Sequence, residues 1–251
     1  HHKVGSALIW KIFEPMCLRI GWTIGNIHGI AERAPPNIDV VQLMHGIVGD
    51  EFPTREFRAV RFVRDPRDVI VSGFLYHKRC SEKWCINEPA GYSSMTYPHI
   101  PWPLQHLGDV EKREWVDHLE ERSYQQNLLE MSQNEGLIFE MKGYAKITIE
   151  SMCSWEDSEQ ILNVRIEDLA IDFENKVIEI MKWVGLDERF IERELDYAKE
   201  HDISRMTKEE ISADSHISSP DVTKWRRYFD DEVLQKYNEL FGEAHTTLGY
   251  E

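Results

Sequence analysis

Positive charge is scarce in this sequence. The 251 residues include 29 Lys and Arg against 45 Asp and Glu, which gives a net charge of -16. This balance argues against a general nucleic-acid binder or a basic membrane-surface protein, since both need an excess of cations. The deficit is uneven, because residues 1–79 hold 11 basic and 8 acidic residues and the remainder is strongly acidic. A basic part within an acidic body is compatible with a small anionic ligand.

Cysteine is also scarce. The chain has four, Cys17, Cys80, Cys85 and Cys153, and their spacing matches no recognisable zinc site. Four cysteines are too few for a disulfide scaffold, although Cys80 and Cys85 could bridge a loop. Free thiols in a reducing compartment are the simpler interpretation.

Long apolar runs, internal repeats and low-complexity tracts are absent. No stretch approaches the ~20 apolar residues that a membrane-spanning helix needs, and no signal peptide is visible. We therefore expect a soluble, cytoplasmic protein that has no membrane partner. A length of 251 residues allows one large domain or two small ones.

The most informative stretch runs from Arg61 to Ser72. Apolar residues within 59–63 predict a buried strand, and a basic turn that contains a proline follows it. Asp68 then opens an apolar helical segment and is the expected N-cap. The end of a strand followed by the start of a helix can bind an anion, because arginine guanidinium groups and the unpaired N–H groups of the helix start both donate hydrogen bonds there. An exposed turn in which Asp65 and Asp68 pair with the arginines is the alternative.

A second candidate anion site lies near the first residue. Lys3, Gly5 and Ser6 precede an apolar stretch, Leu8–Ile20, whose spacing predicts a helix with Ser6 as its N-cap. Glycine allows a close approach of the backbone, and lysine supplies a point charge. The Walker A pattern G-x-x-x-x-G-K-S/T is absent. A helix cap beside a solvated lysine is the alternative.

Strands that alternate with helices predict an α/β fold, a single domain with a central, largely parallel sheet flanked by helices. Strands are expected over 39–44, which ends at His45, and over 160–166. The carboxyl ends of parallel strands meet at one edge of a sheet. Because Lys3, His45 and Arg64 lie at such ends or just after them, we expect them to share one cleft. A structural histidine is the alternative at position 45. Further helices are expected over 111–135, 137–153, 173–184, 187–201 and 231–241, and loops over 21–39 and 49–58.

Two segments lack a regular period. Residues 79–110 are rich in proline, histidine and aromatic residues and predict a lid or pocket wall that binds an organic substrate. An ordered insertion that packs on the body is the alternative. Residues 204–223 are polar and predict a mobile segment, which ends at the basic and aromatic residues 224–226.

These motifs together resemble those of the sulfotransferases that use 3′-phosphoadenosine 5′-phosphosulfate (PAPS). Residues 64–72 are similar to the family's 3′-phosphate element, Arg-Asp-Pro-Arg-Asp-Val-x-Val-Ser, and residues 2–7 resemble its 5′-phosphosulfate loop, Pro-Lys-x-Gly-Thr-Thr. His45 stands where small-molecule members carry a histidine base, and residues 224–226 resemble a late Gly-x-Trp-Lys/Arg motif. The resemblance implies one sulfotransferase domain over residues 1–251 with a P-loop-NTPase-like fold.

The resemblance also implies a reaction and roles for individual residues. PAPS would donate a sulfuryl group to a small organic alcohol, phenol or amine, and the bisphosphate PAP would be the product. No metal would be required. Lys3 would stabilise the leaving phosphate, and His45 would accept the proton of the acceptor as a general base. The residues expected to bind the donor are Lys3, Val4, Gly5, Ser6, Ala7, Leu8, Arg64, Ser72, Lys224, Trp225 and Arg226.

The chain departs from the family pattern at several positions. Ala7 replaces the second threonine of the 5′ loop, Leu8 an aromatic residue, and Ile166 a tyrosine. Residues 218–220 replace a basic triplet, and the strand that feeds the loop would have to precede His1. These departures make a non-catalytic nucleotide-binding relative of the fold one alternative. A P-loop phosphotransferase is the other, although the missing Walker A lysine argues against it.

Overall fold

The computed structural model describes residues 1–49, 52, 57–207, 209 and 221–251. The chain forms two compact units, each assembled from three segments. Unit 1 comprises His1–Ile27, Ala31–Arg64 and Ser154–Val222, and unit 2 comprises His28–Ile30, Asp65–Cys153 and Thr223–Glu251.

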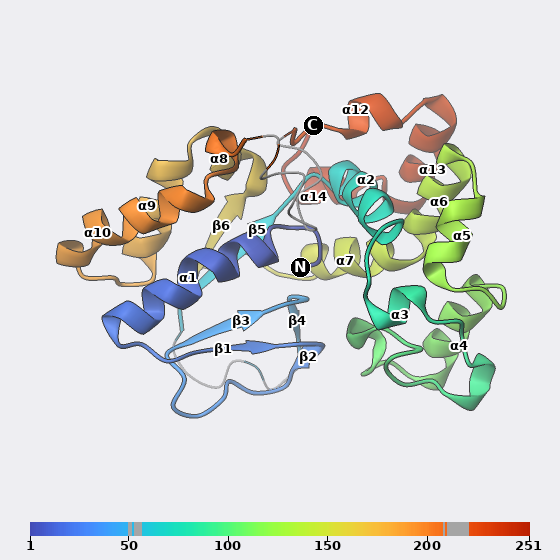
Figure 1. Ribbon diagram of the computed structural model, residues 1–251, viewed down its shortest axis with the longest axis horizontal. Coiled ribbons are helices and arrows are strands. Elements are labelled where there is room, and N and C mark those ends of the chain that lie inside the picture. The colour runs from blue at the N-terminus through green and yellow to red at the C-terminus, as the bar shows by residue number, and fades with distance from the viewer. Residues whose placement is uncertain (50–51, 53–56, 208, 210–220) are drawn as a thin grey trace. The chain divides into compact units, whose positions relative to one another are not determined.

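Paired strands are the framework of unit 1 (Figure 1). β1 (Ile24–Ile27) lies parallel to β3 (Val40–Leu43), and β5 (Ala59–Val63) lies parallel to β6 (Ile161–Arg165). The short strands β2 (Ile30–Ala31) and β4 (Ile47–Val48) form a third pair. β3, β5 and β6 confirm the strands expected from the sequence. In the described part of the chain the strands form three two-stranded sheets, so the single central sheet stays a prediction.

The expected loop over 21–39 is wrong where β1 forms. Gly25 and Asn26 disfavour a strand, but pairing with β3 overrides this local preference. The Thr23 hydroxyl donates to Asp39 Oδ2 at 2.8 Å, and the Asp39 N–H donates to the Thr23 hydroxyl oxygen at 2.9 Å. These bonds fix the start of β1 beside the start of β3.

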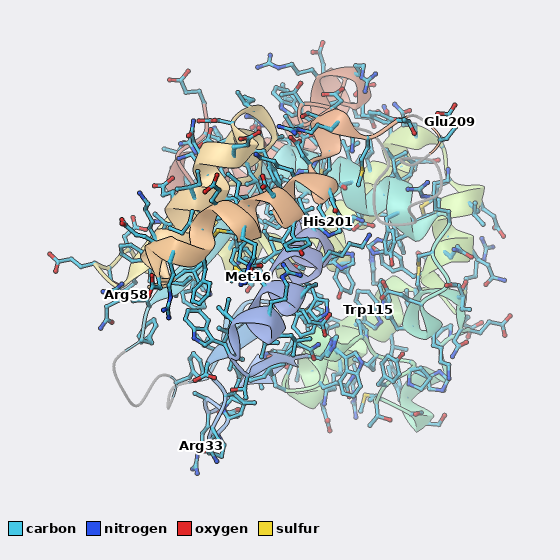
Figure 2. All side chains as sticks on the ribbon, turned by 60° about the vertical axis from the view of Figure 1, so that its left-hand side comes forward. Met16, Arg33, Arg58, Trp115, His201 and Glu209 are labelled. Carbon is cyan, nitrogen blue, oxygen red and sulfur yellow. The ribbon has the colours of Figure 1, made fainter. Side chains whose placement is uncertain are left out.

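Unit 1 also contains helices α1 (Ser6–Ile20), α8 (Ile166–Ile171), α9 (Phe173–Trp183) and α10 (Glu188–Ala198), followed by the 3-10 turns η3 (Lys199–His201) and η4 (Ile203–Arg205). Figure 2 shows Met16 on α1, which packs against α10. Its side chain is only 1% exposed and belongs to the same apolar core as Val177, Ile180 and Met181 of α9. The apolar spacing in the sequence predicted α1, α9 and α10 correctly.

Unit 2 is helical. Its helices are α2 (Pro66–His77), α3 (Lys83–Ile86), α4 (Asp109–His118), α5 (Tyr124–Glu130), α6 (Gln133–Lys142), α7 (Tyr144–Cys153), α12 (Trp225–Tyr228), α13 (Asp231–Phe241) and α14 (Ala244–Thr247). α2 packs against α5, α6, α7 and α12 (Figure 1). Nearly all of its residues are buried, including the polar residues Asp68, Ser72 and His77, so the helix has no exposed polar face. α13 matches the helix expected over 231–241.

The single helix expected over 111–135 is wrong, because the chain breaks twice there. Glu120 and Glu121 have φ angles of 48° and 65°, which no α-helix accommodates. Capping boxes at Ser123 and Ser132 then start α5 and α6. The helix expected over 137–153 is likewise divided at Gly143, where ψ is -119°.

The expectation that Asp68 caps α2 is also wrong. Pro66 is the first residue of the helix, and the Asp65 side chain accepts a hydrogen bond from the Arg67 N–H at 2.9 Å. Proline favours the first helical position, since its missing N–H would have no helical partner there. Asp68 instead lies inside the first turn and accepts from the Trp225 N–H at 3.1 Å.

Residues 79–110 contain α3 and two short 3-10 turns, η1 (Gly91–Ser93) and η2 (Trp102–Leu104). Tyr97 stacks on Trp102 with ring centroids 4.8 Å apart. Most of the predicted mobile segment 204–223, namely 208 and 210–220, lies outside the described residues. Within the part of the chain that is described, none of the helices has the length and apolar character that crossing a bilayer requires.

Two glycines in the left-handed region flank α1. Gly5, with φ of 78°, is the N-cap and Gly21, with φ of 81°, is the C-cap. The prediction that Ser6 is the N-cap is therefore wrong. Ser6 is the first helical residue, and its hydroxyl donates to the His1 carbonyl oxygen at 2.7 Å.

Alanine variants of these two glycines test the packing in front of α1. Gly5→Ala and Gly21→Ala each force a Cβ into the left-handed region, at a cost of about 1–2 kcal/mol. A Cβ at Gly5 would also lie 2.7 Å from Ile166 Cδ1, whereas one at Gly21 meets no atom within 4 Å. We expect Gly5→Ala to lower the free energy of unfolding more than Gly21→Ala does, as measured by urea denaturation.

A rescue variant provides the control. Ile166→Val removes Cδ1, so adding Gly5→Ala to an Ile166→Val background should cost no more than Gly21→Ala. If the two glycine variants lose equal stability and Ile166→Val rescues nothing, Gly5 does not lie against Ile166.

Candidate functional site

The loop His1–Ser6 folds back on itself before α1 begins. The Val4 N–H and the Ser6 hydroxyl both donate to the His1 carbonyl oxygen, at 3.3 and 2.7 Å. Lys3 has φ of 57° and Gly5 has φ of 78°, so two residues of this short loop adopt the left-handed conformation. For lysine this conformation is uncommon and costs energy, which the surrounding contacts must offset.

The start of α1 offers backbone donors to an anion. Ile9 donates to the Gly5 carbonyl oxygen at 2.9 Å, so the N–H groups of Ser6, Ala7 and Leu8 precede the first helical hydrogen bond. Among the described residues no side chain caps this end, and the first turn carries no acidic residue. The positive end of the helix dipole adds to the attraction for negative charge.

Arg64 lies directly after β5 and contacts this loop. Its Nη1 donates to the Lys3 carbonyl oxygen at 3.0 Å, and the residue is only 7% exposed. Its Nε is buried without a hydrogen-bond partner in the described part of the chain. A buried guanidinium needs its donors satisfied, so this N–H is available for a further acceptor. The structure thus brings Lys3 and Arg64 together, as expected.

Two further elements of unit 1 pack around the same loop. Gly5 lies so close to Ile166, the first residue of α8, that a side chain at Gly5 would touch it. Gln42 of β3 donates from Nε2 to the Ser6 carbonyl oxygen at 2.8 Å. The ends of β3, β5 and β6 therefore converge on the loop before α1.

His45 follows β3, and the backbone of the turn that contains it is held from both sides. The His1 Nδ1–H donates to the His45 carbonyl oxygen at 3.1 Å, and Trp155 Nε1 donates to the Gly46 carbonyl oxygen at 2.6 Å. Gly46 has φ of 67°, and a Cβ there would lie 2.3 Å from a ring atom of His1. Lys3, His45 and Arg64 are thus all linked through contacts with residues 1–6.

Sequence reasoning missed the two residues that support this arrangement, Gln42 and Trp155. Gln42 is an ordinary polar position within a strand, and nothing in its spacing indicates a bond to α1. Trp155 carried a weak signal, because it is an isolated aromatic residue in the acidic stretch 154–159. An indole N–H buried in such a stretch usually has a specific acceptor.

In unit 2, the expected donor-binding residues gather around α2. Ser72 lies in the middle of α2 and is buried. The Trp225 N–H donates to Asp68, and the Arg67 guanidinium lies 4.0 Å from the centre of the Trp225 ring. Arg226 lies 4.8 Å from the same ring, and Lys224 is buried. The late motif therefore packs on the first turns of α2.

Arg64, before α2, and Arg67, in its first turn, have different environments. Arg67 forms an ion pair with Asp65 at 2.7 Å and donates to the Glu251 carbonyl oxygen at 2.7 Å. Arg67 therefore pairs with Asp65 as the alternative expected, although both residues are buried and not exposed. Arg64 instead donates to a backbone carbonyl, and its Nε–H has no hydrogen-bond partner among the described residues, as an anion site requires.

Comparison with known proteins gives one match. A family model described as a sulfotransferase domain matches residues 41–249. The matched range includes His45, Arg64, Ser72 and residues 224–226, and the loop before α1 precedes it. Comparisons with curated proteins and with solved structures gave no match. Because the family model covers most of the chain, the chain belongs to the sulfotransferase domain family.

Proposed function

We propose that this sulfotransferase moves the sulfuryl group of PAPS to a hydroxyl or amine of a small organic acceptor. The contact between Arg64 and Lys3 carries the proposal. It joins the buried Arg64 guanidinium to the start of α1. The Arg64 Nε–H has no partner among the described residues, and no described side chain caps α1. PAPS has a 5′-phosphosulfate and a 3′-phosphate on one ribose, so two neighbouring groups of cationic and N–H donors suit it.

The loop before α1 binds the 5′ end of the donor in this proposal. Residues 3–8 contain no carboxylate, and the N–H groups of Ser6, Ala7 and Leu8 point out of the helix start. Gly5 lets the backbone approach the phosphate closely. Arg64 binds the 3′-phosphate, and its bond to the Lys3 carbonyl fixes the spacing between the two phosphate sites.

Sulfuryl transfer is an in-line displacement that depends on positioning and charge stabilisation. The Lys3 ammonium stabilises the charge that develops on the leaving phosphate as the S–O bond to the donor breaks. His45 accepts the proton of the acceptor as the new bond to sulfur forms. Cationic and N–H groups supply all of this stabilisation, so the proposal requires no metal ion.

The remaining residues keep the roles that the resemblance implies. Ser72 contacts the 3′-phosphate, and Lys224, Trp225 and Arg226 close over the donor. Residues 79–110, with the Tyr97–Trp102 stack, hold the acceptor. The family match runs through both units, which supports one sulfotransferase domain over residues 1–251.

Removal of the Arg64 side chain tests the 3′-phosphate site. Arg64→Ala should weaken binding of PAP about 10- to 100-fold, since it removes charge-assisted hydrogen bonds to that phosphate. Binding of AMP, which lacks the 3′-phosphate, should change much less. Isothermal titration calorimetry measures both. Arg61→Ala is the control, because Arg61 lies on the same strand and binds Asp157 and Asn163. Equal losses for PAP and AMP in Arg64→Ala would refute the assignment.

The role of Lys3 is tested by turnover. Lys3→Met keeps the length of the side chain but removes its charge, so kcat should fall about 100- to 1,000-fold. Affinity for PAP should fall far less. Lys11→Met, on the exposed face of α1, is the matched control and should retain activity. An unchanged kcat in Lys3→Met would rule out the proposed role.

The role of His45 is tested by the pH dependence of turnover. His45→Asn should lower kcat about 100- to 10,000-fold and abolish the rise of rate with pH that a histidine base produces. His28→Asn, at an exposed histidine, is the control. Full activity of His45→Asn from pH ~6 to ~9 would place the base elsewhere.

A further inference from the structure

Cys80 and Cys85 stand on either side of the tight turn between α2 and α3 in unit 2. Cys80 follows the end of α2, and Cys85 lies within α3. Both thiols point at one acceptor, because their Sγ atoms lie 4.0 and 3.5 Å from the His77 carbonyl oxygen. The two sulfur atoms are therefore neighbours in the folded chain.

Side chains from several elements hold this turn in place. Gln125 of α5 donates from Nε2 to the carbonyl oxygens of His77 and Cys80, at 3.0 and 2.9 Å. The Glu82 carboxylate accepts from the Tyr76 hydroxyl at 2.5 Å and from the Trp84 indole. These hydrogen bonds hold the turn that carries the two thiols.

The two thiols differ in chemistry. Interaction with the Cys85 thiol lowers the pKa of Cys80 to about 7, and a hydrogen bond with the Glu82 backbone adds to this shift against the opposing effect of burial. The same interaction, together with burial, raises the pKa of Cys85. Cys80 is 8% exposed and Cys85 is fully buried. This is the arrangement of an attacking thiolate beside a resolving thiol.

Cys17 is a contrast within the same chain. It is fully buried in the apolar core of unit 1, where burial and the charge of Asp39 raise its pKa to about 11. A thiol of this kind stays protonated and inert near neutral pH. Cys17 and the Cys80–Cys85 pair are therefore not equivalent, because Cys80 joins a lowered pKa to a neighbouring thiol and Cys17 does not.

We propose that Cys80 and Cys85 form a redox-active dithiol that a peroxide oxidises to an intramolecular disulfide. The Cys80 thiolate attacks one peroxide oxygen, the O–O bond breaks, and Cys80 becomes a sulfenic acid, while the other oxygen leaves as hydroxide and takes up a proton to form water. The Cys85 thiol then attacks the Cys80 sulfur, the S–S bond forms, and water leaves. Two thiols lose two electrons, which reduce one peroxide. The disulfide ties the first turn of residues 79–110.

Mass spectrometry of the full-length reduced chain after treatment with hydrogen peroxide tests this. The expected product has lost two hydrogen atoms in mass. Trypsin cleaves after Lys83 and so separates Cys80 from Cys85, which means that only a disulfide keeps the two peptides together. Cys17→Ser and Cys153→Ser should form the same product. Two free thiols at Cys80 and Cys85 after oxidation, or a disulfide to Cys153, would overturn the proposal.

Single variants and native-state labelling separate this from a structural role. Cys85→Ser should accumulate a sulfenic acid at Cys80, trapped by dimedone, because the resolving thiol is missing. In the folded wild-type chain, alkylation of one thiol should reach half its maximal rate near pH 7. This readout needs no variant to fold. An alkylation profile in which no thiol reacts until the pH approaches ~8.5, the ordinary thiol pKa, would contradict the proposal.

Discussion

The hydrogen bond from Arg64 Nη1 to the Lys3 carbonyl oxygen links two parts of the chain that are 61 residues apart. It ties the end of β5 to the loop before α1, and the rest of the candidate site depends on that link. The loop places two residues in the left-handed conformation, so it needs contacts from outside to hold its shape. Arg64, Gln42 and Ile166 supply them from β5, β3 and the start of α8.

This link also explains why the two arginines of one short motif differ. The Arg67 guanidinium pairs with Asp65, donates to the Glu251 carbonyl oxygen and lies over the face of the Trp225 ring. Through Trp225 it joins the late motif to α2. Arg64 donates to a single backbone oxygen and keeps a buried Nε–H without a partner among the described residues. The Arg67 contacts stabilise the fold. The Nε–H of Arg64 can still bind an acceptor, as expected of an arginine that binds an anionic ligand.

The sequence predicted the elements that have a strong hydrophobic period, and it failed where backbone conformation or distant contacts decide. β5, α9 and α13 could be predicted from apolar spacing, and the position of Lys3, His45 and Arg64 at or after strand ends led to the expectation that they share one cleft. The caps were wrong at Ser6 and Asp68, since Gly5 and Asp65 take those positions through a left-handed φ and a proline start. The breaks at Glu120 and Glu121 had no local signal, because glutamate normally favours a helix. Trp155 and Gln42 act only through partners far away in sequence.

The central claim is that the loop before α1 and Arg64 together form a site for a 3′,5′-bisphosphorylated nucleoside. Its most direct test is calorimetric titration of the wild-type chain with PAP in the absence of metal and with ATP in the presence of Mg²⁺. The account predicts that PAP binds without metal and that it binds more tightly than ATP. Tight binding of Mg²⁺–ATP with no detectable binding of PAP would contradict the account and favour a phosphotransferase.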